Sequence, residues 1–207
     1  MKTQAPIRSA PSHVNSSLPL KNHEDFGWIV IPYSREIEEH ARAIRHRRDQ
    51  RYGNVFSVLP NDRRHYGDLG EMTFIHWLRK NRVQDFTWNV ASPSRNSDVT
   101  LHGREIDVKT CKSREEISQA FLVLCSDHTL DSSPANELFF CCCLYNDQKM
   151  LLLGGIPKDA FRKKATKQIP KAALQNGLTN RDRPMWTLPA YELEKPTEWL
   201  ARQLRAK

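Results

Sequence analysis

The chain has 207 residues, of which 39% are hydrophobic and 27% are charged, enough for one buried core in a single domain with extensions. No apolar run is long enough to span a membrane, and residues 1–25 lack the apolar stretch of a secretory signal, so we expect an intracellular protein without a membrane partner. The formal net charge of +8 favours a polyanionic partner, most often nucleic acid.

The first half of the chain predicts helices around short apolar segments. Residues 1–25 are rich in Ser, Pro and Asn, and we expect them to form a disordered tail. The elements expected next are an apolar segment at 26–33, a helix from 34 to about 53, a loop at 60–62, a helix opening at Asp68 and a strand at 85–91.

The second half predicts mainly sheet. The expected elements are a hairpin over 98–111, a strand at 120–126, a hairpin of 137–145 with 149–157, a helix at 158–167 and a helix at 196–206. The order indicates an α/β fold with a mixed β-sheet flanked by helices. We expect its core at 26–165, and a basic C-terminal extension at 166–207 whose last helix packs on the same domain.

The cysteines predict buried thiols rather than disulfides. There are five, an odd number, and three of them are adjacent at 141–143. Zinc is the competing interpretation, because Cys125 and His128 have ligand-like spacing. Zinc is disfavoured, since no second C-x-x-C pair exists and consecutive strand cysteines point to opposite faces.

The segment "GREIDVKTC" at 103–111 carries charges at every second position. In a strand, Ile106, Val108 and Thr110 would face a core. The opposite face would then hold Glu105, Asp107 and Lys109. That face is either solvated or part of an active site.

Hairpin geometry brings a second acid to this strand. If the turn is centred on His102 and Gly103, Asp98 lies across from Asp107. If it is centred on Gly103 alone, Asp98 faces Val108 and lies beside Asp107. Opposed carboxylates repel, so either register favours a cation or a proton between them.

The helix opening at Asp68 supplies a third acid. Glu71 shares the helical stripe of Phe74, Ile75 and Leu78, which should face the core. A carboxylate in that position needs a partner. The alternative is an acid that only stabilises the first turn of the helix.

These residues together resemble the PD-(D/E)XK, or restriction-endonuclease-like, nuclease superfamily. The resemblance covers about residues 66–165 and rests on Glu71 in "GDLGE", Asp98 in "SDVTL", and Asp107 with Lys109 in "IDVKT". It implies a core of a mixed four-stranded sheet flanked by helices, and a nuclease acting on DNA more often than on RNA. Endonucleolytic cleavage is favoured, and whether the protein forms a homodimer is left open.

The acids predict a site for Mg²⁺ or Mn²⁺, since Asp98, Asp107 and Glu71 offer hard oxygen ligands. The resemblance adds the backbone carbonyl of Val108 as a ligand. Lys109 is placed to orient a water or to stabilise the transition state, and it could act as a neutral base if burial lowers its pKa.

Two features weaken the motif. Ser97 precedes Asp98 where the family has proline, which leaves Asp85 as an alternative, although Asp85 is farther from the hairpin. A second acid-x-lysine tripeptide, Asp147-Gln148-Lys149, lies on a predicted turn, so the tripeptide alone carries little weight.

Two basic segments predict nucleic-acid contacts, one around residues 42–51 and one over 157–183. The candidate binding residues are Arg45, Arg47, Arg48, Lys112, Lys163, Lys164 and Lys167. The alternative for each segment is a solvated basic helix face. The alternative function is a nucleic-acid-binding or assembly protein on the same fold without catalysis.

Overall fold

The computed structural model describes residues 23–52, 64–90, 97–168 and 185–205. Most of the expected tail, the loop at 60–62, most of the turn before Asp98 and the basic stretch at 169–184 lie outside these residues.

The α/β fold expected from the sequence is confirmed. The elements are η1 (His23–Phe26), β1 (Ile29–Pro32), α1 (Arg35–Tyr52), α2 (His65–Lys80), β2 (Phe86–Trp88), β3 (Val99–Leu101), β4 (Arg104–Ser113), β5 (Leu122–Ser126), α3 (Asp127–Ser132), β6 (Glu137–Leu144), β7 (Lys149–Pro157), α4 (Lys158–Lys164), β8 (Thr166–Gln168), β9 (Met185–Pro189), η2 (Ala190–Glu192) and α5 (Pro196–Arg205).

Two helix boundaries differ from the prediction. The helix expected from Asp68 begins three residues earlier, so Asp68 stands in its first turn, where an acid is favourable. The helix expected to reach Lys167 ends at Lys164, because Thr166 to Gln168 extend and pair with β9 instead. Thr166 is β-branched, which favours the strand.

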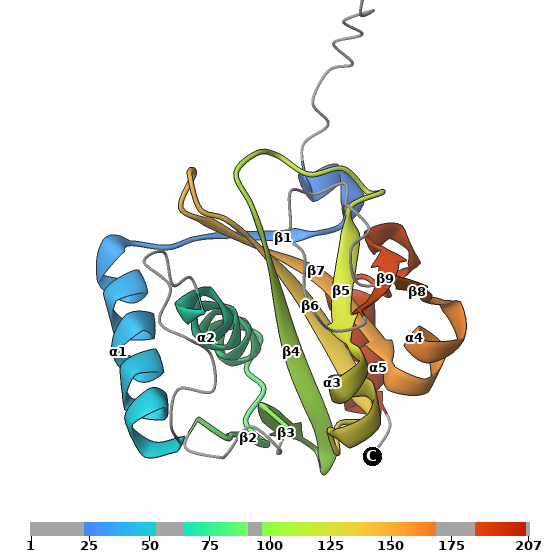
Figure 1. Cartoon of the computed structure of the whole chain (residues 1–207), viewed down its shortest axis with the longest axis horizontal. Helices are drawn as coiled ribbons and strands as arrows, with labels where there is room; N and C mark the ends of the chain where they lie inside the picture. Colours follow the sequence, from blue (N-terminus) through green and yellow to red (C-terminus); the bar gives the residue numbers. More distant parts are fainter. Residues whose placement is uncertain (1–22, 53–63, 91–96, 169–184, 206–207) are drawn as a thin grey trace, which may run out of the picture.

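The strands form two sheets (Figure 1). The larger has six strands in the order β1-β7-β6-β4-β3-β2, in which β4 and β6 are parallel and all other neighbours are antiparallel. The smaller has three strands in the order β5-β9-β8. The larger sheet therefore exceeds the four strands that the resemblance implies, since β1 and β2 extend it at both edges.

Side-chain alternation along β6 divides the interior into two cores. Phe139, Cys141 and Cys143 pack on the face that α2 covers, and Phe140 and Cys142 pack on the face toward β5 and β9. Figure 1 shows α2 between α1 and the six-stranded sheet, with the small sheet and α4 on the other side. All five cysteines are buried free thiols, as predicted, and adjacent ones point to opposite faces.

Helix α5 closes the α2 side of the sheet. Trp199 is fully buried against Phe74 and Phe139, with ring centroids 5.8 and 4.9 Å away. Its indole Nε1 donates a 3.0 Å hydrogen bond to Glu137, which also pairs with Arg202 at 2.8 Å. In the part of the chain that the structure describes, no helix is long and apolar enough to cross a membrane.

Helix α2 lies so close to β4 that one glycine is required. A Cβ at Gly70 would overlap Thr110 Oγ1 and lie 3.1 Å from Thr110 Cβ, whereas a Cβ at Gly67, in the same helix, meets nothing within 4 Å. We expect Gly70→Ala to lower the free energy of unfolding by about 1–3 kcal/mol, because the overlap outweighs the better helix propensity of alanine. Gly67→Ala should raise it by up to about 1 kcal/mol. Urea unfolding of both variants measures the difference, and equal effects would contradict the close approach.

Candidate active site

The β3–β4 hairpin sets the register of the site. Val99 pairs with Ile106, and Leu101 pairs with Arg104, so the turn is centred on His102 and Gly103. Both turn residues have positive φ, 48° and 76°, as a two-residue type I′ turn requires. The first of the two predicted registers is therefore correct for these pairs, and Asp98 stands directly before the last of them, Val99 with Ile106.

Among the described residues, the pairing of β3 with this edge of β4 does not continue beyond Val99 and Ile106. Asp98 N donates a 3.0 Å hydrogen bond to Ile106 O, and the next amide along that edge, Val108 N, donates to Asp98 Oδ2 at 2.8 Å. The N–H and C=O of one strand residue point to the same edge, so the Val108 carbonyl faces this edge too. The sequence-predicted oxygens of Asp98 and Val108 thus meet at one place.

Asp107 and Lys109 lie on the face of β4 opposite α2. Asp107 is only 5% exposed, and Lys109 Nζ lies 2.5 Å from its Oδ1. Glu105, on the same face, accepts hydrogen bonds from Ser97 and Thr100. A solvated face does not bury a carboxylate to this extent, so Asp107 belongs to a partly buried polar cluster with Lys109, whose side chain is 27% exposed.

The pKa values of the two aspartates are shifted in opposite directions. Burial raises the pKa of Asp98, and the nearby carboxylates of Glu71 and Asp107 raise it further. Burial also opposes ionisation of Asp107, but the Lys109 cation and a hydrogen bond with Asp98 lower its pKa overall. The surroundings therefore favour the charged form of Asp107 more than that of Asp98.

Lys109 is an ammonium cation in this arrangement. Burial alone would lower the pKa of Lys109, but the carboxylates of Asp107 and Asp98 outweigh it and raise the pKa above its ordinary value. The option of a neutral Lys109 acting as a base is thus disfavoured. The residue is suited to orient a water or to stabilise negative charge.

Glu71 faces the interior, as its stripe predicts, and is 5% exposed. Both carboxylate oxygens are occupied, because Arg48 Nη1 and Nη2 donate to them at 2.8 and 2.7 Å and Trp88 Nε1 donates at 3.1 Å. Arg48 also bonds Asp68 at 2.7 Å, and Arg45 bonds the same carboxylate at 2.7 Å. The acid in the first turn of α2 is Asp68. Glu71 therefore does not fit the alternative of an acid that only stabilises the first turn of the helix.

The donor set fits a hard divalent cation. Over the described ranges, no three His, Cys, Asp or Glu side chains converge to hold a metal by themselves. Mg²⁺ commonly takes only one or two protein carboxylates and completes its shell with water and substrate phosphate. Asp98 and Asp107, whose carboxylates repel each other, and the Val108 carbonyl supply such a set. Glu71 would join it only by leaving Arg48.

The predicted nucleic-acid-binding residues of α1 and β4 divide into two kinds. Arg45 and Arg48 point at the acids of α2, whereas Arg47 is exposed. Lys112 is half-buried on β4, on the face opposite Lys109.

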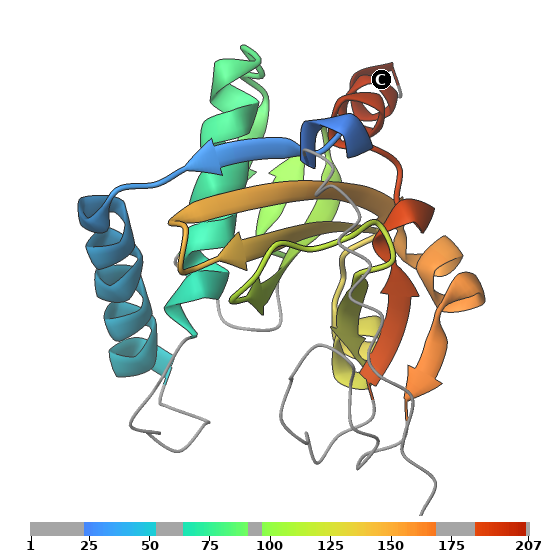
Figure 2. The same ribbon diagram turned by 90° about the horizontal axis from the view of Figure 1, so that it is seen from above.

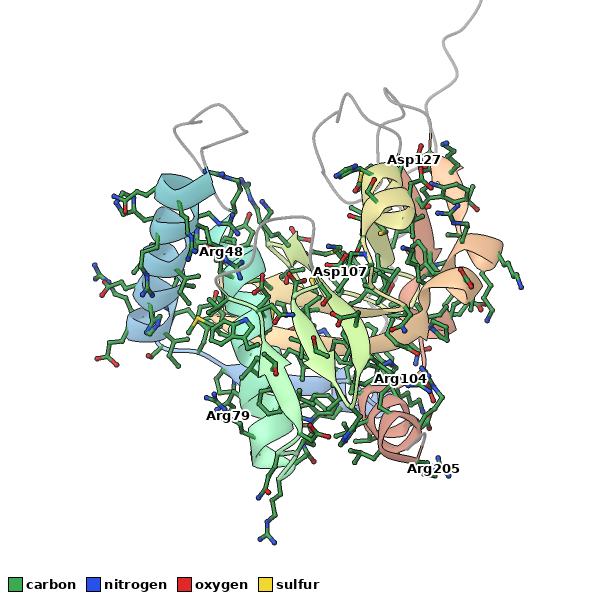
Figure 3. The ribbon with its side chains drawn as sticks, turned by 90° about the horizontal axis from the view of Figure 1, so that it is seen from below. Arg48, Arg79, Arg104, Asp107, Asp127 and Arg205 are labelled. Atoms are coloured by element: carbon green, nitrogen blue, oxygen red, sulfur yellow. The ribbon has the colours of Figure 1, made fainter. Side chains whose placement is uncertain are left out.

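The predicted basic residues near the C-terminal extension lie at the surface. Lys163 is exposed on α4, Lys164 pairs with Glu192 at 2.9 Å, and Lys167 of β8 pairs with Asp127 at 2.9 Å. Figure 3 shows Asp127, Asp107 and Arg48 on one side of the molecule, with Arg79, Arg104 and Arg205 on the other.

The competing acids lie elsewhere. The side chain of Asp85 is 81% exposed and pairs with His102 at the hairpin tip, so Asp98 is the acid that approaches Asp107. Asp147 of the second tripeptide is exposed on the β6–β7 connection, as predicted, and Lys149 is the first residue of β7.

The ion pairs by which Arg45 and Arg48 of α1 bind Asp68 and Glu71 of α2 were not predicted from the sequence. Arg45 and Arg48 are three residues apart on one helix, and Asp68 and Glu71 are three apart on the next. Residues three apart lie on the same face of a helix. A basic i, i+3 pair on one helix and an acidic i, i+3 pair on the next could therefore have predicted these ion pairs.

Comparison with known protein families, with curated proteins and with solved structures finds no match for this chain. The interpretation of the site therefore depends on its geometry and its chemistry.

Proposed function

We propose that this chain is a metal-dependent nuclease that hydrolyses phosphodiester bonds, in DNA in preference to RNA. The observation that carries the proposal is the close approach of Asp98, Asp107 and Lys109 beside the start of β3. Asp107, which is buried, and Asp98 repel each other beside the ammonium group of Lys109, and such an arrangement is costly to maintain for structure alone.

Each residue of this cluster has a role in the proposed reaction. Asp98, Asp107 and the Val108 carbonyl would hold Mg²⁺ or Mn²⁺, which neutralises charge on the scissile phosphate and makes a bound water more acidic. Lys109, kept protonated by the two aspartates, donates hydrogen bonds to the attacking water or to the charged phosphate oxygens. Glu71 orients the site through Arg48 and Trp88.

Basic residues on both sides of the cluster support a nucleic-acid partner. In Figure 2 the C-terminal end of α1 extends to the same side of the molecule as α3 and the start of β9. Arg47 is exposed near the end of α1, and Lys167 of β8 lies beside Asp127 of α3. A polyanion lying across the cluster of Asp98, Asp107 and Lys109 would be attracted from both directions.

The second candidate is a nucleic-acid-binding protein without catalysis. The specific observation in its favour is that Asp68 and Glu71 are both neutralised by arginines, as in a structural ion-pair network. In that case the basic residues would bind and the acids would only hold α1 on α2.

Cleavage assays separate the two candidates. We expect labelled linear, branched or single-stranded DNA to be cut in Mg²⁺ or Mn²⁺ and cutting to stop in EDTA, because the acidic pair then lacks its cation. RNA of the same sequence should be cut more slowly. Binding without cleavage of any DNA in either metal would instead support the second candidate.

A further inference from the structure

A hollow of about 290 Å³ opens between the end of α1 and the edge strand β2. Its lining residues are His40, Ile44, Arg47, Arg48, Arg51, Trp88 and Val90. The volume is close to the lower limit, about 300 Å³, of pockets that hold small ligands. The lining combines an indole ring and aliphatic side chains with three arginines, so its chemistry is aromatic and cationic together.

The walls of the hollow are held in place by the acid beside it. Trp88 Nε1 donates to Glu71 Oε2 at 3.1 Å, and Arg48 Nη2 donates to the same atom at 2.7 Å. Arg48 Nε also donates to Val90 O at 3.1 Å. The indole and the guanidinium group are thus fixed before any ligand arrives, which lowers the entropy cost of binding.

Charge and aromaticity define the ligand. Nucleic-acid bases stack on aromatic rings, and arginines bind the phosphate that follows. Glu71 does not repel an anion from the hollow, since Arg48 neutralises its carboxylate. Arg47 is exposed at the hollow and is available for a phosphate.

We propose that this hollow takes one unpaired nucleotide of the substrate, with its base on Trp88 and its phosphate at Arg47. A base inside a continuous duplex is stacked on its neighbours and cannot present its face to an indole. The ligand class is therefore nucleic acid with a single-stranded segment, such as a single strand or a branched end.

The inference rests on the proposed function and names its substrate class. Trp88 pairs with Val99, the neighbour of Asp98, Asn89 N donates to Asp98 O at 2.9 Å, and Trp88 Nε1 bonds Glu71, so the hollow lies next to Asp98. An unpaired nucleotide held beside Glu71 would place the adjoining phosphate near Asp98 and Asp107. Selection of the single strand would thus occur next to the proposed point of cleavage.

The test measures binding in EDTA, where no cleavage intervenes. Fluorescence anisotropy compares a labelled short oligothymidylate with a blunt duplex of the same length. We expect the wild type to prefer the single strand. Trp88→Leu and Arg47→Ala should each weaken single-strand binding roughly tenfold or more, because one stacked base or one phosphate contact is lost.

Two variants serve as matched controls. Phe86→Leu removes an aromatic ring from the same strand, and Arg79→Ala removes one positive charge on the opposite side of the molecule (Figure 3). Neither residue lines the hollow, so both variants should bind the single strand like the wild type. Trp88→Phe keeps a ring for stacking and should retain the preference, even if Trp88→Leu fails to fold.

Equal affinity of the wild type for the single strand and the duplex would overturn the inference. So would unchanged single-strand binding by Arg47→Ala and by folded Trp88→Leu. These outcomes are independent of catalysis. If no metal supports cleavage but the Trp88 and Arg47 effects are found, the nuclease proposal fails and the nucleotide site stands.

Discussion

Replacing Asp107 with asparagine is expected to lower the rate of DNA cleavage by at least about 100-fold, the size of loss seen when one group that stabilises transition-state charge is removed. The change keeps the shape of the side chain, but removes its charge and one of the oxygens proposed to hold the metal. Asp107 is also the carboxylate that keeps Lys109 in position, at 2.5 Å. Cleavage of labelled DNA in Mg²⁺ measures the rate.

The chain contains its own control for this experiment. Asp147 stands in the other acid-x-lysine tripeptide, is exposed and lies on the β6–β7 connection. Asp147→Asn makes the same chemical change and should leave the cleavage rate unchanged. DNA binding in EDTA should be as tight or tighter for Asp107→Asn, since a negative charge near the phosphate is removed. Asp107→Asn that cuts at the wild-type rate would exclude the aspartate from catalysis.

The hairpin and its acids could be predicted because their determinants are local. A two-residue turn with Gly103 fixes the register, and period-2 alternation then places Ile106 and Asp107 on opposite faces. The apolar stripe of α2 likewise placed Glu71 in the interior. These inferences need only the spacing of residues within one element or one tight turn.

The pairing of distant segments could not be predicted in this way. Residues 120–126 read as a strand, but nothing in their apolar pattern indicates that β5 leaves the main sheet to pair with β9. The same limit applies to Lys167, which the sequence places on a helix and the structure places in β8, because its partner strand is far along the chain. Strand partners depend on packing, which a local pattern does not contain.

The basic stretch of α1 shows a different limit. Its arginines were predicted to contact nucleic acid, and charge density alone gives no direction to a side chain. The structure directs Arg45 and Arg48 at Asp68, which is fully buried, and leaves Arg47 exposed. The same segment thus joins α1 to α2 and provides one wall of the hollow beside β2.

Replacing Arg48 with methionine is expected to lower the free energy of unfolding by about 3–5 kcal/mol, the usual cost of removing one partner from a buried ion pair. The side chains of Asp68 and Glu71 are 0% and 7% exposed, and Arg48 bonds both. Methionine keeps the aliphatic packing but leaves two carboxylates short of a donor. Urea unfolding at neutral pH measures the loss.

Arg42→Met on the same helix is the matched control. Arg42 is 53% exposed and pairs with Glu38 four residues away, so its removal should cost at most about 0.5 kcal/mol. A second change tests the cause. Adding Glu71→Gln to Arg48→Met should restore part of the lost stability, because one of the uncompensated charges disappears.

The pH dependence of the stability lost in Arg48→Met independently tests whether the ion pairs cause that loss. Burial raises the pKa of Asp68 in the wild type, although Arg45 and Arg48 oppose it, so its ionisation already opposes folding at neutral pH. Removing Arg48 deepens that penalty. Protonation relieves it, so the deficit of the variant relative to the wild type should shrink as the pH falls from 7 toward the ordinary pKa of aspartate, about 3.9. A deficit that does not change with pH would instead mean that Arg48 stabilises the fold mainly through contacts other than its ion pairs.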